Sequence, residues 1–133
     1  MEGIEKVYQF LDEAKTYYLA TAEGDQPRVR PFGTALLFGG KLYLQTGKIK
    51  NVSKQVAANS KVEICCMNGD RCLRLTGELV NDDSREVKVA LLEKMPYLKS
   101  MYGPDDGNMQ MLYLKNATAV FSSFTAKPEV IRF

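Results

Sequence analysis

The sequence predicts a small, mainly β protein with flanking helices, and the fold it favours is an antiparallel barrel. The chain has 133 residues, of which 45% are hydrophobic and 26% charged, which is enough apolar material for the core of one domain spanning residues 1–133. Six or more segments have the character of strands, whereas few have helical periodicity. Many short strands with few helices are typical of small antiparallel barrels.

The N-terminal part is predicted to contain one helix and two strands. A helix is expected over residues 2–15, because apolar side chains recur on one helical stripe, at Ile4, Val7, Leu11 and Ala14. Residues 16–22 are rich in strand-forming types, and residues 23–27 form a turn. Residues 28–38 form the second predicted strand, in which Pro31 indicates an edge position or a bulge.

A tight hairpin is predicted at Gly39 and Gly40, since both glycines tolerate positive φ. This turn would pair Leu36 with Tyr43 and Thr34 with Gln45. Because side chains alternate along strands, one polar and aromatic face is then expected to carry Arg28, Arg30, Phe32, Thr34, Tyr43 and Gln45. The opposite face is expected to be core and to carry Val29, Ala35, Leu37, Leu42 and Leu44.

The rest of the chain continues as strands interrupted by two helices. Gly77 indicates a bulge or a close backbone approach within its strand, and residues 97–108 are the least regular stretch. The expected elements are a helix over 52–59 capped by Asn51, strands at 62–67 and 71–80, a helix from Asp82-Asp83-Ser84 to Pro96, strands at 109–114 and 117–124, and an edge strand or tail at 128–133.

The net charge of +2 conceals a strong asymmetry along the chain. Residues 27–61 contain no Asp or Glu but seven Lys or Arg residues, so this span carries +7 and the remainder −5. Cations gathered into one acid-free stretch indicate a local anion site, although a solvated basic face is the plainer alternative.

The stretch from Gln45 to Asn51 is the candidate phosphate site. It combines a strand end, the Thr46 hydroxyl, a glycine, Lys48, Lys50 and an asparagine at a helix start, and such groups can converge on a phosphate. Arg30 can supply a bidentate guanidinium, and Gln45 can hydrogen-bond a heterocycle. The alternative is a plain loop with surface lysines. Four aromatic residues are candidates either for a pocket or for the core: Tyr97, Tyr102, Phe121 and Phe124.

Several classes of function are excluded by composition. The chain has no histidine, which removes Ser-His-Asp and Cys-His catalysis, His-ligated zinc and a proximal haem histidine. Its three cysteines, Cys65, Cys66 and Cys72, lack zinc spacing, so no metal site is expected, and free thiols agree with the cytoplasm. The carboxylates show no obvious close pair for acid-base work, no apolar run is long enough to cross a membrane, and no catalytic side chain is identified.

Two segments carry a resemblance to a known family. Residues 19–66, LATAEGDQPRVRPFGTALLFGGKLYLQTGKIKNVSKQVAANSKVEICC, and residues 74–80, RLTGELV, occur in an order similar to that of the FMN-binding split-barrel family that includes pyridoxamine 5′-phosphate oxidase. The similarity is greater to its short bacterial general-stress-protein branch. The resemblance implies a six-stranded antiparallel split β-barrel that forms a homodimer, with FMN in clefts at the interface.

The resemblance also implies roles for individual residues. Arg30 matches an arginine that approaches the phosphate end of FMN, Gln45 and Thr46 match a Tyr-Thr pair, and Lys50 and Asn51 fall where the oxidases have Ser-Arg. Together with Lys48, these are the six expected cofactor-binding residues. The partner subunit is expected to contribute from residues 121–124.

The expected function is that of an FMN-dependent oxidoreductase acting on an unidentified small molecule. The oxidases' substrate-binding arginine-histidine pattern and C-terminal tryptophan are missing from the sequence, which disfavours pyridoxamine phosphate oxidation. The nitroimidazole-resistance and haem-degrading branches are disfavoured because the chain has no histidine. The alternatives are a small-barrel module for single-stranded nucleic acid, which the near-neutral charge makes the weaker choice, and a non-catalytic flavin- or haem-binding sensor.

Overall fold

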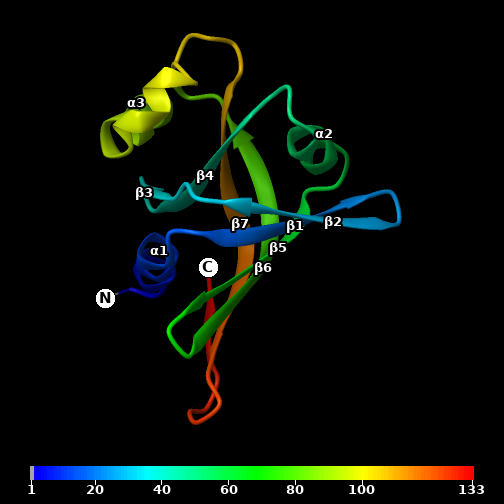
Figure 1. The fold of residues 1–133 in the computed structure, drawn as a ribbon, viewed down its shortest axis with the longest axis vertical. Helices are drawn as coiled ribbons and strands as arrows, with labels where there is room; N and C mark the ends of the chain where they lie inside the picture. The colour runs from blue at the N-terminus through cyan, green and yellow to red at the C-terminus, as the bar shows by residue number, and fades with distance from the viewer. Residues whose placement is uncertain (1) are drawn as a thin grey trace.

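A computed structural model describes residues 2–133 as one antiparallel sheet with three α-helices (Figure 1). In chain order the elements are α1 (Gly3–Ala14), β1 (Tyr17–Glu23), β2 (Gln26–Phe32), β3 (Leu36–Phe38), β4 (Lys41–Gly47), α2 (Asn51–Ala58), β5 (Lys61–Asn68), β6 (Arg71–Asp82), α3 (Arg85–Lys94), the 3-10 helix η1 (Pro96–Ser100), β7 (Met109–Ser122) and β8 (Glu129–Arg132).

The strands follow the order β2-β1-β5-β6-β7-β4-β3, and β8 pairs with β7. This mainly β, antiparallel architecture confirms the predicted class and is consistent with a split barrel, although the sheet does not close and holds eight strands rather than six. No helix within residues 2–133 is long and apolar enough to cross a membrane.

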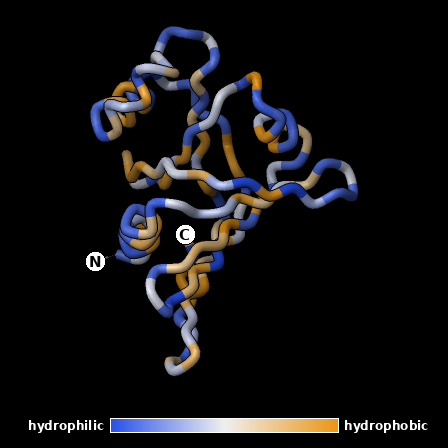
Figure 2. Tube along the Cα trace, viewed as in Figure 1, coloured by the Kyte–Doolittle hydropathy of each residue, from blue (hydrophilic) through white to orange (hydrophobic). Residues whose placement is uncertain are grey.

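Two hydrophobic clusters hold the sheet. The larger lies between α1, α2 and the faces of β1, β4, β5, β6 and β7, and the smaller joins β3, β4 and β7 to α3 and η1. Hydrophobic residues accordingly follow the strands in Figure 2, whereas the β1–β2 turn and the loop that precedes β7 are hydrophilic. The strand β4 lies between the two clusters and is buried along six of its seven residues.

The predicted hairpin is confirmed, but the strand before it is shorter than expected. Gly39 and Gly40 have φ of 58° and 76°, and Leu36 pairs with Tyr43. The predicted strand 28–38 is divided between β2 and β3, which pair with different partners, β1 and β4. Thr34 and Gln45 are not paired as strand residues, contrary to the prediction. They are joined instead by a hydrogen bond that the Gln45 backbone N–H donates to the Thr34 hydroxyl at 3.1 Å.

The predicted division of faces is wrong at both ends. Val29, expected in the core, is 68% exposed, because β2 is an edge strand and Val29 lies outside both hydrophobic clusters. Tyr43 and Gln45, expected on a face pointing away from the interior, are buried, because α3 and η1 cover the second face of β4. Pro31 lies in the edge strand β2, as predicted.

Gly77 marks the predicted irregularity. The β6–β7 register shifts between Thr76 and Glu78, and a Cβ at Gly77 would lie 3.1 Å from Leu114 Cδ2 and 3.3 Å from the Lys115 carbonyl oxygen. Because the shift is absorbed as a bulge, β7 continues from Met109 to Ser122 as one strand where two were predicted.

The first prediction concerns this bulge. Gly77→Ala should lower the free energy of unfolding by about 1–2 kcal/mol, because the neighbouring backbone must move to accept the methyl group. Gly103→Ala is the matched control, since a Cβ there meets nothing within 4 Å. Urea unfolding of both variants tests this, and equal stabilities would contradict it.

A second prediction concerns the Tyr43 hydroxyl, which donates to Asp82 Oδ2 at 2.6 Å. This bond, and then the bond from the Ser84 amide, lowers the pKa of Asp82. The stability it contributes is therefore present above the ordinary carboxyl pKa and is lost as pH falls through the lower, folded-state pKa. Tyr43→Phe should cost about 1 kcal/mol at neutral pH.

That deficit should shrink as the solution is acidified below about pH 4. Unfolding free energies measured against pH for wild type and Tyr43→Phe provide the test, with Tyr18→Phe, at an exposed tyrosine, as the control. A deficit that does not change with pH would show that the hydrogen bond to the carboxylate is not its source.

Candidate functional site

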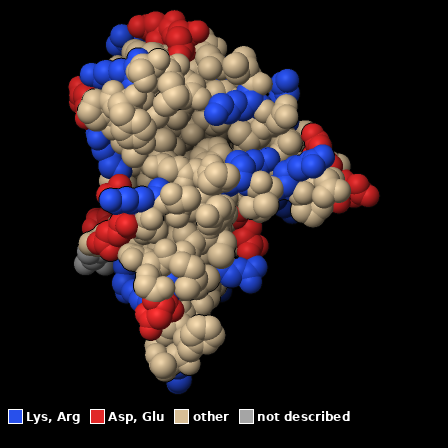
Figure 3. Space-filling view, viewed as in Figure 1, with Lys and Arg blue, Asp and Glu red and all other residues tan. Residues whose placement is uncertain are grey.

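Two adjoining clefts open beside the N-terminus of α2. Their volumes are ≈ 300 Å³ and ≈ 450 Å³, and Arg30, Lys50 and Val52 line both. The first extends between the β2–β3 connection, the end of β4 and η1, and the second between β2 and α2. In Figure 3, Lys and Arg side chains gather over β2 and α2 at the edge of a hollow. The acid-free, cationic stretch of sequence therefore lines a concave surface.

The Arg30 guanidinium is the fixed point of this site. Its Nη1 donates to the Leu19 carbonyl oxygen at 3.2 Å and to Thr21 Oγ1 at 2.8 Å, and its Nη2 donates to Gln55 Oε1 at 2.6 Å. Thr21 and Gln55 are buried and hydrogen-bonded to each other at 2.6 Å. Arg30 therefore joins β1, β2 and α2, and its orientation is set before any ligand arrives.

No carboxylate neutralises this guanidinium within residues 2–133. The three acceptors are neutral oxygens, and the nearby Glu23 carboxylate is paired with Arg28 at 2.9 Å. Burial, and then the neighbouring Arg28 charge, lower the pKa of Arg30. A partly buried cation with only neutral partners and spare N–H donors favours an anion, for which arginine can form bidentate bonds.

The N-terminus of α2 adds further donors. The helix begins at Asn51, Lys50 occupies the N-cap position, and the first turn contains no acidic residue. Asn51 is therefore the first helical residue and not the cap that the sequence predicted, and no side chain caps the helix. The first backbone N–H groups of a helix lack intrahelical partners and carry partial positive charge, so this end favours an anion.

Gln45 and Thr46 line the first cleft from the end of β4. Both are almost fully buried, and Gln45 Nε2 donates to the Thr46 carbonyl oxygen at 2.8 Å. The structure thus brings Arg30, Gln45, Thr46 and Lys50 to the first cleft and Arg30, Lys50 and Asn51 to the second.

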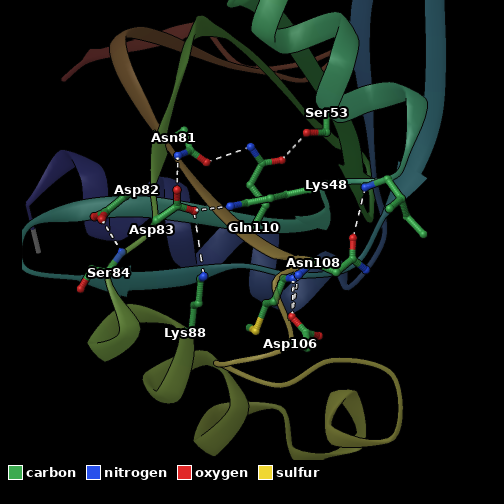
Figure 4. A network of polar contacts seen from close by, with 12 residues as sticks. Lys48, Ser53, Asn81, Asp82, Asp83, Ser84, Lys88, Asp106, Asn108 and Gln110 are labelled. Atoms are coloured by element: carbon green, nitrogen blue, oxygen red, sulfur yellow. Dashed lines mark hydrogen bonds and ion pairs between the residues drawn. The ribbon is translucent and has the colours of Figure 1, made fainter.

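Lys48, the sixth predicted residue, lines neither cleft. Its Nζ lies 3.2 Å from Asp83 Oδ1, and its amide donates to the Asn108 carbonyl oxygen at 2.7 Å. Asp83 also faces Lys88, with the two charged atoms 4.0 Å apart (Figure 4). Lys48 is thus not among the residues that line the two clefts, because the turn after Thr46 directs its side chain toward the start of α3.

A series of side-chain hydrogen bonds connects the Lys48–Asp83 ion pair to α2. Asn81 Nδ2 donates to Asp83 Oδ2 at 3.0 Å, Gln110 Nε2 donates to Asn81 Oδ1 at 2.8 Å, and Ser53 Oγ donates to Gln110 Oε1 at 2.6 Å (Figure 4). The series crosses from β6 through β7 to the first turns of α2. It fixes the helix whose N-terminus borders both clefts.

The first cleft has an apolar wall formed by η1 and the residues after it. Tyr97, Leu98, Met101 and Tyr102 line it, and Tyr97 and Met101 are 60% and 61% exposed. Tyr97 and Tyr102 are thus pocket aromatics, one of the two roles that the sequence left open, whereas Phe121 is in the core. A planar ring can pack against such a wall while its polar end reaches Arg30.

Sequence reasoning missed the residues that hold Arg30. Thr21 and Gln55 are polar residues in a strand and a helix with no local motif, and only the tertiary contact between β1, β2 and α2 gives them a role. Of the wall formed by η1 and the residues after it, the sequence named Tyr97 and Tyr102 as pocket candidates but missed Leu98 and Met101.

Comparison with known proteins identifies the family. The family described as pyridoxamine 5′-phosphate oxidase matches residues 4–122. A search of curated proteins found no match. The crystal structure of a NimC/NimA family protein from Clostridium acetobutylicum is 45% identical, with a TM-score of 0.96, and the alignment covers 98% of this chain and 92% of that one.

Two more distant structures share the fold. General stress protein 26 from Bacillus anthracis is 18% identical, with a TM-score of 0.75 and 97% of each chain covered. A pyridoxamine 5′-phosphate oxidase-related, FMN-binding protein from Nostoc punctiforme PCC 73102 is 15% identical, with a TM-score of 0.65, covering 95% of this chain and 90% of that one. Identity is thus higher to the NimC/NimA family protein than to the general stress protein. On the match over residues 4–122 and the 45% identity, the chain belongs to the pyridoxamine 5′-phosphate oxidase family.

Proposed function

We propose that this protein binds FMN non-covalently in the two adjoining clefts, with the phosphate at Arg30, Lys50 and the N-terminus of α2. The observation that carries the proposal is the partly buried Arg30 guanidinium, which is held in place by three neutral oxygens and has no carboxylate partner within residues 2–133. A phosphate dianion supplies the missing negative charge and accepts several hydrogen bonds at once.

The remaining features of the clefts fit the rest of FMN. Their volumes lie in the range of small-molecule sites. The Gln45 and Thr46 side of the first cleft offers polar groups to the ribityl chain or ring edge, and the η1 wall offers apolar contact to the ring face. The fold relative from Nostoc punctiforme that is described as FMN-binding supports the same ligand for this chain.

The activity we propose is electron transfer between a reduced nicotinamide and a small molecule not identified by the structure. When bound, FMN supplies the redox chemistry, and the chain binds, orients and partly shields it. The residues lining the two clefts include neither a histidine nor a close carboxylate pair to act as a general acid or base. The three cysteines are free thiols, which fits the cytoplasmic location we propose.

The cationic side chains at this site favour a small anion over a nucleic-acid strand. They gather where β2 meets α2, and the adjoining wall of the first cleft, formed by η1, carries no charge. Proteins that bind single-stranded nucleic acid instead have a continuous groove lined with cationic side chains and with aromatic side chains that stack on the bases.

Comparing FMN with riboflavin tests the phosphate assignment. Lys50→Ala and Arg30→Ala should each weaken FMN binding about tenfold or more, because each removes a charged hydrogen-bond donor, and should change riboflavin binding much less. Lys48→Ala is the matched control and should bind FMN as wild type does, since Lys48 lines neither cleft. Quenching of flavin fluorescence gives the dissociation constants.

Three outcomes would contradict the proposal. Wild-type protein that shows no flavin absorption after gel filtration with FMN does not bind the cofactor. Equal losses for FMN and riboflavin would place the phosphate elsewhere. Tighter binding of haemin than of FMN would make this a haem protein. Lys50 is exposed, so Lys50→Ala keeps the test valid even if Arg30→Ala disturbs the fold.

We further propose that a second copy of the chain completes the clefts. The β7–β8 hairpin projects from the body of the molecule, and Phe124 near its tip is fully exposed (Figure 1). Residues 121–124 were predicted to contact the partner subunit. Phe121 is buried in the core of its own subunit, so Phe124 is the aromatic residue of this segment that is free to make the contact. Aromatic residues are enriched at protein–protein interfaces, so an exposed phenylalanine on a projecting arm supports this contact.

Phe124→Ser should therefore shift the protein from dimer toward monomer, because the buried area of one aromatic side chain is lost. Analytical ultracentrifugation across a concentration series measures this shift, with Lys127→Ala on the same hairpin as the control. A wild-type protein that is monomeric at every concentration and still binds FMN fully would refute the dimer and leave the phosphate assignment standing.

A further inference from the structure

Three sulfur-containing side chains lie together on the outer face of the β5–β6 hairpin. In the register of these strands Cys65 faces Arg74 and Met67 faces Cys72, so Cys65 and Cys72 are diagonal neighbours on one face. Their Sγ atoms are 4.0 Å apart. Met67 is directly opposite Cys72 and two residues from Cys65, and facing residues of an antiparallel pair share a face. None of the three lines either cleft.

The 4.0 Å separation fits a bridging ion better than a disulfide. A disulfide needs the two sulfurs about 2.05 Å apart, and diagonal strand positions lie near or beyond the usual Cα span for such a bond. Metal–sulfur bonds of about 2.3 Å that meet at about 120° place two sulfurs about 4.0 Å apart. An ion can therefore bridge Cys65 and Cys72 where they stand.

The donor set indicates which ion. Two thiolates and a thioether are soft ligands, which select Cu(I) over hard divalent cations. Within residues 2–133 no three His, Cys, Asp or Glu side chains form a cluster of their own, so a conventional zinc or calcium set is lacking. Cu(I) accepts a trigonal arrangement of three sulfurs, and the Met67 thioether on the same face can offer the third.

The surroundings allow an ion to enter from solvent. Cys65 and Met67 are exposed and Cys72 is partly exposed. The Arg74 guanidinium lies across from Cys65 but is paired with the Glu63 carboxylate, to which its Nε donates at 2.9 Å. The net negative charge of a bis-thiolate complex is therefore stabilised mainly by solvent. Cys66 points to the opposite face, into the core, where burial raises the pKa of its thiol to about 12. It is therefore excluded from the site.

We propose that Cys65, Cys72 and Met67 form a binding site for one Cu(I) ion per chain. Binding releases the proton of each thiol, forms two copper–thiolate bonds and one copper–thioether bond, and leaves the oxidation state of copper unchanged. The site does not depend on the proposed FMN binding.

Anaerobic titration of the reduced protein with Cu(I), in competition with a chromophoric chelator, tests the site. One ion should bind per chain, and Cys65→Ser and Cys72→Ser should each weaken binding at least tenfold. Met67→Leu should weaken it by a smaller factor, because a thioether is a weaker donor than a thiolate. Cys66→Ala is the matched control and should leave binding unchanged.

Affinity should also rise with pH, since both thiols must lose their protons to bind the ion. Wild-type protein that binds Cu(I) no more tightly than the Cys65→Ser, Cys72→Ser double variant would overturn the proposal. So would a loss in Cys66→Ala equal to that in Cys65→Ser. Conversion of Cys65 and Cys72 to a disulfide by mild oxidants, without Cu(I) binding, would assign the pair to thiol redox chemistry instead.

Discussion

The site depends on the three hydrogen bonds that the Arg30 guanidinium donates to neighbouring oxygens. The guanidinium lies on the edge strand β2, and its bonds reach the Leu19 carbonyl on β1 and Gln55 on α2. Such an edge strand has a ladder partner on one side only, so these side-chain bonds supply the second attachment. They also fix a cation beside the N-terminus of α2 without neutralising it. The same contacts thus attach the edge strand β2 to α2 and leave the positive charge of Arg30 available to a ligand.

The two-sided burial of β4 explains how the rest of the site is placed. Leu42 and Leu44 pack in the large cluster and Tyr43 in the small one, so the strand is held from both faces. Gln45 and Thr46, at the end of this strand, are thereby held in fixed positions in the lining of the first cleft. The small cluster also contains Leu98 of η1, which sets the distance of the apolar wall from Arg30. Changes in the packing of α3 should therefore alter the width of the cleft.

Much of this was predictable from local sequence, and the rest depended on distant contacts. The glycine pair at 39–40 requires positive φ at both positions, so the hairpin and the pairing of Leu36 with Tyr43 followed directly. Lys50 and Asn51 could be grouped because they are adjacent at a predicted helix start, and Arg30 could be added because the family resemblance aligned it with the phosphate end of FMN. The direction of the Lys48 side chain could not be predicted, since it is set by the ion pair with Asp83, thirty-five positions later in the sequence. The burial of Tyr43 was missed because alternation along one strand does not reveal a second covering layer.

We propose above all that Arg30, Lys50 and the start of α2 form a phosphate site for FMN. A crystal structure of the protein grown with FMN tests it most directly. Phosphate oxygens should lie within about 3 Å of the Arg30 guanidinium nitrogens and of Lys50 Nζ, as charge-assisted bonds require. A phosphate that faces solvent, or a flavin bound away from both clefts, would contradict it.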